Sequence, residues 1–293
     1  MQVSFLIVTK NRPSELAFTL DRLKGLLDLS IHEVLVFIDG CSKTEVIVAN
    51  YQWVNWTISD ISISASPARN ALYRKATGTI LIGLDDDAHP LNEDCIAKIE
   101  TVFSVDSSIG IIAFQEIRGV YETHQEALLS AESAIKQYYT NGFVGCGFAI
   151  RKEVYDKTRG FPIWIDIYGE EPCLAIEVIE LGFEILYSNE IIVNHRVDKK
   201  KRLAQGRNYF RFEKQLKNAI YYYLVYYPKP TFKIIRLLVH NFEKYAVTDK
   251  RCFVLFFKSI FTVLLSLSNV LKFRKPVSKD TLQKVKSLKS IKY

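Results

Sequence analysis

The sequence lacks internal repeats, low-complexity segments and any CxxC pair of cysteines. With 48% hydrophobic and 24% charged residues, its 293 residues have the composition of a globular chain rather than a disordered or solenoid one. The five cysteines are odd in number and have no nearby histidine that would suggest zinc. We therefore expect reduced, cytosolic thiols at Cys41, Cys95, Cys146, Cys173 and Cys252.

The N-terminus also lacks the features of a secretory signal. Its apolar run over residues 1–8 is short, has no basic region before it and has no small-residue cleavage site after it. We expect this run to be a buried first strand. The polar segment that follows, residues 9–13, contains no glycine, whereas a nucleotidyltransferase would normally carry a glycine-rich triphosphate loop near its N-terminus.

Excess positive charge is missing from most of the chain. The formal net charge is +7, but residues 251–293 alone hold ten Lys and Arg against one acidic residue. The preceding 250 residues hold 29 basic and 31 acidic groups. The body is therefore nearly neutral, and we expect no nucleic-acid partner, although a nucleic-acid-binding module using the basic C-terminal segment is an alternative that salt-sensitive binding would reveal.

Apolar strands alternate with helices along the first two thirds of the chain. Strands are predicted over residues 3–8, 33–38, 78–84, 111–115, 145–150 and 190–193, and helices from residue 13 and over 67–76, 126–139, 151–157 and 169–182. This alternation predicts an α/β fold with a mostly parallel sheet, whose ligands bind outside the carboxyl ends of the strands. Asp39 and the aspartates after residue 84 should then share one crevice.

Three consecutive aspartates, Asp85, Asp86 and Asp87, follow a buried strand and would repel one another unless a cation or solvent screened them. A divalent metal explains the cluster economically, because Mg²⁺ or Mn²⁺ is bound by one or two carboxylates and by phosphate oxygens. The alternative is an aspartate-rich helix N-cap.

Four segments in order resemble the nucleotide-binding signatures of family 2 glycosyltransferases of GT-A fold, which invert the sugar's anomeric configuration. They are Val8 to Pro13, Ile38 to Ser42, Ala68 to Ala71 with Ala76 to Gly78, and Leu84 to Asp87. The resemblance covers about residues 1–225. It implies a Rossmann-like GT-A domain that uses Mn²⁺ or Mg²⁺ and a UDP-, dTDP- or GDP-sugar, as in bacterial polysaccharide synthesis.

The resemblance also assigns roles in the donor site. Thr9, Arg12 and Asp39 become nucleotide-site candidates, with Arg69 and Asn70 lining the same pocket. Asp85 and Asp87 form the DxD pair that holds metal and diphosphate, and Asp86 is placed with the donor-binding residues. Taken alone, Asp39 would be a turn residue before glycine, and the two arginines would be surface groups.

A second pair of acids, Glu170 and Glu171, opens a helix that has Pro172 near its start and Gly182 after its end. It is similar to the family's Glu-Asp motif on the acceptor side. Inversion needs a carboxylate that takes the proton of the acceptor hydroxyl. We expect Glu171 to be this base, although the family usually has Asp there, and Glu170 to bind or orient the acceptor. Two acids that merely satisfy a helix N-terminus are the alternative.

His195 follows the last apolar strand and matches the family pattern of a histidine that reaches the metal or diphosphate, whereas a lone histidine is more often structural. Residues 196–217 hold nine basic and two acidic groups and could close over the diphosphate as a loop, or form a solvated basic face. The small residues around Cys146 resemble the family's segment between donor and acceptor halves, but they could equally mark close packing.

The C-terminal segment differs from the body. Tyrosines cluster over residues 221–227, and residues 253–271 are aromatic and aliphatic apart from Lys258 and several small polar residues. We favour a core-packed or interfacial helix over a transmembrane one. An aromatic belt beside a basic tail also suits peripheral contact with the cytoplasmic face of an anionic inner membrane.

The sequence thus predicts a GT-A domain over residues 1–225, with a donor half over about 1–115 and an acceptor half over about 116–225. A helical, basic extension over 226–293 follows. The expected activity is metal-dependent, inverting transfer of a sugar, hexosyltransferase-like, to a hydroxyl of a glycan or lipid-linked acceptor in the cytoplasm. A nucleotidyltransferase acting on sugar phosphates is the alternative enzyme.

Overall fold

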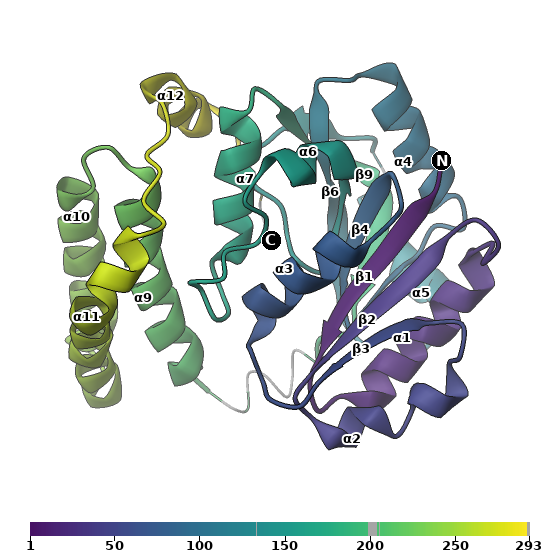
Figure 1. The fold of residues 1–293 in the computed structure, drawn as a ribbon, viewed down its shortest axis with the longest axis horizontal. Helices are drawn as coiled ribbons and strands as arrows, with labels where there is room; N and C mark the ends of the chain where they lie inside the picture. The colour runs from purple at the N-terminus through teal and green to yellow at the C-terminus, as the bar shows by residue number, and fades with distance from the viewer. Residues whose placement is uncertain (133, 199–203, 205, 292–293) are drawn as a thin grey trace.

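The protein is described from a computed structural model, which covers residues 1–132, 134–198, 204 and 206–291. A nine-stranded sheet runs through its centre (Figure 1), in the order β3-β2-β1-β4-β8-β6-β9-β5, with β7 paired to β9. The strands are β1 Val3–Thr9, β2 Glu33–Asp39, β3 Asn55–Ser59, β4 Ile80–Asp85, β5 Ala88–Pro90, β6 Ile109–Arg118, β7 Gln137–Tyr139, β8 Gly147–Arg151 and β9 Glu184–His195.

The four strands β3, β2, β1 and β4 are all parallel. Parallel strands end at the same edge of a sheet, so the ends of β1, β2 and β4 lie together, with Thr9 beside Ile38 and Val8 beside Asp85. Beyond β4 the sheet is mixed, because β8 is antiparallel to β4 and β6 while β9 is parallel to β6. The expected parallel sheet is therefore found in the donor half.

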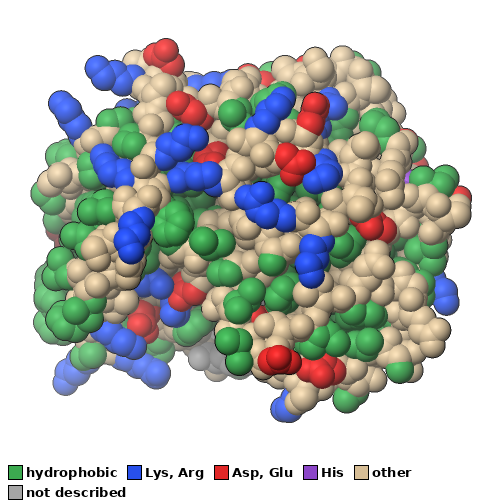
Figure 2. Space-filling model, in the orientation of Figure 1, with side chains coloured by type: hydrophobic (Ala, Val, Ile, Leu, Met, Phe, Trp, Pro, Cys, Tyr) green, Lys and Arg blue, Asp and Glu red, His purple; other side chains and the backbone are tan. Residues whose placement is uncertain are grey.

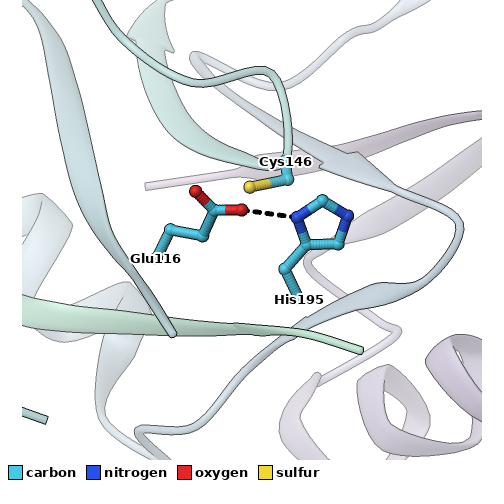
Figure 3. Close-up of side chains that lie close together, drawn as sticks. All are labelled: Glu116, Cys146 and His195. Atoms are coloured by element: carbon cyan, nitrogen blue, oxygen red, sulfur yellow. Dashed lines mark hydrogen bonds and ion pairs between the residues drawn. The ribbon is translucent and has the colours of Figure 1, made fainter. Parts of the chain in front are cut away.

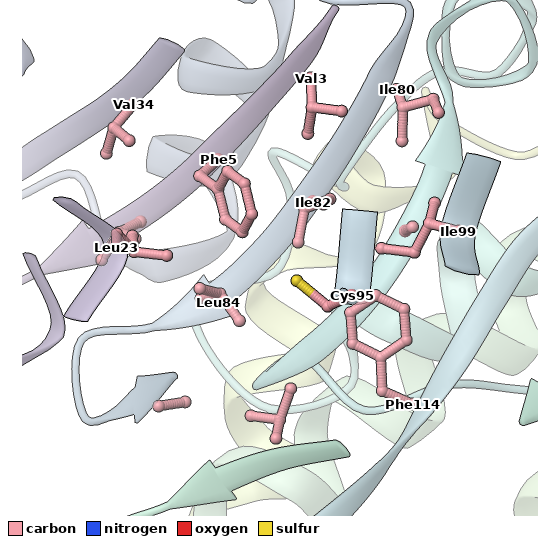
Figure 4. Close-up of a cluster of buried hydrophobic side chains, with 14 of the residues drawn as sticks. Val3, Phe5, Leu23, Val34, Ile80, Ile82, Leu84, Cys95, Ile99 and Phe114 are labelled. Atoms are coloured by element: carbon pink, nitrogen blue, oxygen red, sulfur yellow. The ribbon is translucent and has the colours of Figure 1, made fainter. Parts of the chain in front are cut away.

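Helices cover both faces of the sheet. One face packs against α1 Pro13–Leu26 and α4 Cys95–Val105, and Figure 4 shows Leu23, Cys95 and Ile99 beside the strands there. The other face packs against α3 Ala65–Lys75, α6 Lys152–Lys157 and α7 Glu170–Glu180. Neighbouring strand residues point to opposite faces, which is why Phe5 and Ile7 join the first core and Leu6 the second. Short helices α2 Ser42–Glu45 and η1 Val48–Asn50 follow β2.

Helices after β9 form a third core at the left end of Figure 1. They are α9 Tyr209–Tyr226, α10 Thr231–Asn241, the π-helix η2 Phe242–Ala246, α11 Lys250–Leu271 and α12 Lys279–Ser287. This core is joined to the sheet domain through α7, where the Tyr226 hydroxyl donates to Glu177 Oε1 at 2.6 Å. The expected helical extension is present.

Two expectations about local structure are wrong. The helix expected over residues 126–139 ends early: α5 is His124–Leu129, and Gln137–Tyr139 is strand β7, antiparallel to β9. The long strand β9 offers a free edge there, and Tyr138 packs its ring on Tyr187 at 4.8 Å. The basic loop expected over 196–217 is helical from Tyr209 onward, while its residues 199–203 and 205 lie outside the described chain.

Candidate functional site

Polar and charged side chains meet where β1 and β4 end. Thr9 Oγ1 donates to Asp86 Oδ2 at 2.8 Å, and the Arg12 guanidinium contacts Asp86 Oδ1 at 2.9 Å and Asp87 Oδ2 at 2.6 Å. Arg12 stands just before α1, whose first turn begins at Pro13. The structure therefore brings Thr9, Arg12, Asp86 and Asp87 together, and the aspartates are not simple helix caps.

The two buried aspartates have opposite electrostatic surroundings. Burial raises the pKa of Asp86 to about 7, although Arg12 and Thr9 offset part of that effect. Burial also acts to raise the pKa of Asp87, but hydrogen bonds from His195 and Arg12 outweigh it and hold this pKa well below its usual range. Asp87 is the carboxylate that stays ionised.

His195, at the end of β9, is held between two carboxylates. Its Nε2 lies 3.2 Å from Asp87 Oδ1 and its Nδ1 lies 2.5 Å from Glu116 Oε1 (Figure 3). Burial alone would lower the histidine's pKa, but the bonds to Asp87 and Glu116 raise it to about 9. Glu116 thus fixes the ring so that Nε2 faces the aspartates, as carboxylates do for many metal-binding histidines.

Asp85, Asp87 and His195 each offer a ligand atom, and these atoms lie within 4.8 Å of one another. Two carboxylates and an imidazole nitrogen suit Mn²⁺, and Asp85 remains partly exposed toward the cleft, so these residues fit a metal of the expected kind. Glu116, Cys146 and His195 form a second such group, drawn in Figure 3. There, burial raises the pKa of the Cys146 thiol.

Arg69 on α3 joins Asp85 to Glu170 and Glu171. Its Nη2 lies 2.6 Å from Asp85 Oδ1, and its Nη1 lies 3.1 Å from Glu170 Oε1 and 3.4 Å from Glu171 Oε1. Gly145 makes this possible, since a Cβ there would come within 2.5 Å of Glu171 Oε1 and 2.8 Å of Arg69 Nη1. The glycine of this small-residue segment is therefore needed for close packing around the ion pairs.

Glu170 and Glu171, at the start of α7, differ in access. The side chain of Glu170 is 4% exposed, and that of Glu171 is 22% exposed. Burial, reinforced by the neighbouring Glu171, raises the pKa of Glu170 against the opposing effect of Arg69. Within the described part of the chain, Glu170 Oε2 is buried without a hydrogen-bond partner.

Two of the expected nucleotide-site residues bind neighbouring loops. Asp39 accepts hydrogen bonds from the Ser62 hydroxyl and from the backbone N–H groups of Ile63 and Ser64 at 2.6 to 3.2 Å. Asn70 donates to the carbonyl oxygens of Phe161 and Arg159. Both side chains are nearly buried, and in the structure they hold these loops in place.

Sequence reasoning missed Glu116 and misjudged the role of Arg196. Glu116 directly follows the apolar run over residues 111–115, a signal like the one that identified Asp39 and Asp85, although β6 itself continues to Arg118. Arg196, expected in a mobile basic loop, instead contacts His89 Nδ1 at 2.7 Å and donates to Thr19 Oγ1 at 2.7 Å and to the Glu15 carbonyl. It fixes α1 against the aspartate loop, and no motif indicated this role.

Known structures resemble this fold. A GalNAc-T7 structure with UDP, GalNAc and Mn²⁺ aligns at a TM-score of 0.59 and 18% identity over 80% of this chain, which spans 49% of that protein. The mannosyltransferase PcManGT from Pyrobaculum calidifontis, with GDP-Man and Mn²⁺, aligns at a TM-score of 0.57 and 16% identity, over 97% of this chain and 83% of that protein. S. aureus TarS 1-349 with UDP-GlcNAc aligns at a TM-score of 0.55 and 14% identity, over 83% of this chain and 73% of that protein.

These likenesses show the GT-A fold, while sequence comparison shows the family. No curated protein is similar enough in sequence to match this chain. The family model for glycosyl transferase family 2 matches residues 4–159, which is more than half of the chain and includes the strand ends that carry Thr9, Asp39 and Asp85. The match decides for a glycosyltransferase over a nucleotidyltransferase. The chain belongs to glycosyl transferase family 2.

Proposed function

We propose that this enzyme transfers a sugar, with inversion, from a UDP-, dTDP- or GDP-sugar to a hydroxyl of a glycan or lipid-linked acceptor. The observation that carries the proposal is the contact of Arg69 with Asp85 on one side and with Glu170 and Glu171 on the other. The Arg69 guanidinium alone separates the carboxylate of Asp85 from those of Glu170 and Glu171. A sugar between them would have its diphosphate on one side and a base on the other, as in-line displacement requires.

Glu171 is proposed as the base. It is the more exposed of the two glutamates, whereas burial favours the protonated form of Glu170. The Glu171 carboxylate takes the hydroxyl proton as the acceptor oxygen bonds to C1, and the bond between C1 and the diphosphate oxygen breaks. Glu170 is proposed to bind or orient the acceptor, with its own position fixed by Arg69.

The donor side is proposed to hold Mn²⁺ or Mg²⁺ on Asp85, Asp87 and His195. When bound there, the metal would neutralise charge on the diphosphate. Arg12 adds a fixed positive charge, while Thr9 and Asp86 keep Arg12 in place. Asp39 and Asn70 are proposed to act on the nucleoside through the loops that they hold.

We further propose a donor half over about residues 1–115, an acceptor half over about 116–225 and a C-terminal extension over 226–293. The proposed setting is synthesis of a surface polysaccharide in the cytoplasm, at the inner face of the membrane. Relatives in fold have been crystallised with UDP, GDP-Man and UDP-GlcNAc, which supports a nucleotide-sugar donor without selecting its base or sugar.

A thermal-shift panel tests this proposal. UDP-, GDP- and dTDP-sugars are added with and without Mn²⁺ to the wild type, to Asp87→Ala and to the control Asp156→Ala, whose carboxylate pairs with Lys152 on the surface of α6. One donor should stabilise the wild type and the control in a metal-dependent way, by about 2.7 kcal/mol at a hundredfold excess over Kd. Absence of such a donor, or an undiminished response in Asp87→Ala, would refute the mechanism.

A further inference from the structure

The last long helix turns its most apolar side away from the protein. On α11, Cys252, Phe256, Ser259, Val263 and Val270 are buried, and the helix packs against α9. The opposite side exposes large apolar side chains, several of them by more than 60%: Phe253, Val254, Phe257, Phe261, Leu264 and Leu265. Within the described residues, this helix is the one long and apolar enough to span a membrane by length and composition.

Helix α10 extends this surface. Its exposed residues Phe232, Ile235 and Val239 are spaced three and four apart and therefore share one side of the helix, and α10 has no buried residue. The ring of Phe242, in the π-helix that connects α10 to α11, packs on the rings of Phe253 and Phe257 at 6.2 and 6.5 Å. The exposed apolar residues of the two helices, linked through Phe242, are together called here the α10/α11 face.

Positive charge surrounds this face. Helix α11 contains no acidic residue between Lys250 and Leu271, and Lys258 and Lys272 lie beside or beyond its exposed apolar residues. Over residues 226–293 the sequence has fifteen Lys and Arg against three acidic residues. Figure 2 shows the hydrophobic side chains at the left end of the molecule with Lys and Arg side chains among them. The face therefore complements a surface that is apolar inside and negatively charged outside.

We propose that the α10/α11 face docks on a bilayer that contains anionic lipids, with its apolar side chains in the acyl boundary and its lysines among the headgroup phosphates. An interfacial position fits the packing better than a spanning one, because one side of α11 is fastened to the protein. Lys258 pairs with Glu213 of α9 at 2.9 Å, and Ser259 is fully buried against α9. A helix held along its length in this way lies in the membrane plane.

Docking there would bring the acceptor side of the active site to the membrane. Asp249, at the start of α11, pairs with Arg207 at 3.2 Å. Four residues on, the Arg211 guanidinium lies 5.0 Å from the ring of Tyr168, which is two residues before Glu170. This purpose rests on the proposed function, since a lipid-linked acceptor would have its reactive hydroxyl near the bilayer and near Glu171.

A pocket next to the face offers a place for a headgroup phosphate. It has a volume of about 300 Å³, lies among α9, α10 and η2, and is lined by Arg207, Arg211 and Asn208 together with apolar residues such as Phe212 and Leu237. Arginine binds phosphate through two parallel hydrogen bonds, and the apolar lining suits the start of an acyl chain. Headgroup and chain of one lipid would then be held at the same end of the extension.

Vesicle flotation of the full chain tests the docking surface. Wild type, Phe261→Asp/Leu264→Asp and the control Val105→Asp/Leu129→Asp are mixed with phosphatidylcholine vesicles with and without phosphatidylglycerol. The control residues are also exposed but lie on α4 and α5. Wild type and control should float with the anionic vesicles, and the helix variant should bind these vesicles at least about tenfold more weakly than the wild type.

Failure of the wild type to float, or equal flotation of the helix variant, would overturn the proposal. A third outcome would also overturn it: light scattering shows a stable wild-type dimer and a monomeric helix variant, and neither protein binds vesicles. The α10/α11 face would then be the contact with a second copy of the chain. Metal-dependent donor binding is measured on the same samples, and Asp87→Ala should float like the wild type. If the wild type floats but binds no donor, the glycosyl-transfer proposal fails and the docking surface stands.

Discussion

The sheet edge and the α10/α11 face both depart from the usual rule that apolar side chains are buried and charged ones exposed, but in opposite directions. At the sheet edge, ionic groups that normally stay in water are buried: Arg69, Asp86, Asp87 and Glu170 are each less than 10% exposed. On α10 and α11, large apolar groups that are normally buried face outward. The first arrangement is stabilised within the chain by ion pairs, whereas the second has no partner in the described structure. Chemistry is expected at the first site and association at the second.

The largest effect should come from Glu171→Gln. If the carboxylate takes the acceptor proton, kcat falls by about 10²- to 10⁴-fold, while donor binding in thermal shift is unchanged. Steady-state kinetics with a donor found in the panel give the measurement, and Glu170→Gln is the matched variant, expected to raise KM for the acceptor more than it lowers kcat. The reverse ranking would move the base to Glu170.

Arg69→Met should affect stability as well as activity. The substitution leaves Asp85, Glu170 and Glu171 without their shared counter-charge, and breaking a buried ion pair costs about 3 to 5 kcal/mol of unfolding free energy. Lys75→Met, on an exposed position of the same helix, should change it by less than about 0.5 kcal/mol. Urea unfolding compares the two variants, and equal curves would show that the sheet edge does not depend on this bridge.

Glu116→Gln should weaken metal binding without touching a ligand. The glutamine cannot hold His195 as a carboxylate does, and loss of such a partner typically lowers metal affinity by about 10- to 100-fold. Titrating Mn²⁺ at saturating donor measures the change, with the exposed Glu122→Gln as control. An unchanged Mn²⁺ affinity would make Glu116 a structural residue and His195 a histidine of the core.

The smallest effect is expected at the junction between the two regions. Asp166 accepts from Lys214 Nζ at 2.5 Å and Lys217 Nζ at 3.1 Å on α9. Burial opposes ionisation of this carboxyl, but the two lysines outweigh it and hold its pKa well below the usual range. A lowered folded-state pKa stabilises the protein above the unfolded value, and this contribution is lost as pH falls through the folded pKa.

Asp166→Asn should therefore lower the free energy of unfolding by about 1 kcal/mol at neutral pH. The difference from wild type should narrow as the pH drops below about 4, where the unfolded carboxyl takes up its proton. Urea unfolding at neutral and acidic pH gives the comparison. A difference that stays constant with pH would mean that the amide disturbs packing and that the charge is unimportant.

The meeting of Asp39 and Asp85 at one sheet edge was predictable because it follows from local pattern. An apolar run that ends in an acid, repeated at Asp39 and Asp85, is enough to place both residues at one sheet edge when the strands are parallel. Glu116 was missed although it also follows an apolar run, because its partner His195 lies 79 residues away and no local spacing records the pairing of β6 with β9. Long-range pairing also overrode the helical pattern near Tyr138.

The C-terminal helices show a different limit of sequence reasoning. Residues 253–271 are apolar on nearly every side, so composition indicates a helix but not which side is covered. The structure answers this through α9, which takes up Phe256, Ser259 and Val263 and leaves Phe257, Phe261 and Leu264 outside. Similarly, Asp39 and Asn70 match a family motif, yet their side chains hydrogen-bond to loops whose path no motif predicts.

All five thiols are reduced and buried, and they are divided between the two regions, with Cys146 beside His195 and Cys252 against α9. The thiols of Cys146 and Cys252 cannot react with an alkylating reagent until the structure around them opens. Pulse labelling followed by mass spectrometry of the peptides would therefore time the opening of the catalytic cleft and of the outer helices separately, in one unmodified sample. Bound donor should slow the first label, and bound vesicles should slow the second.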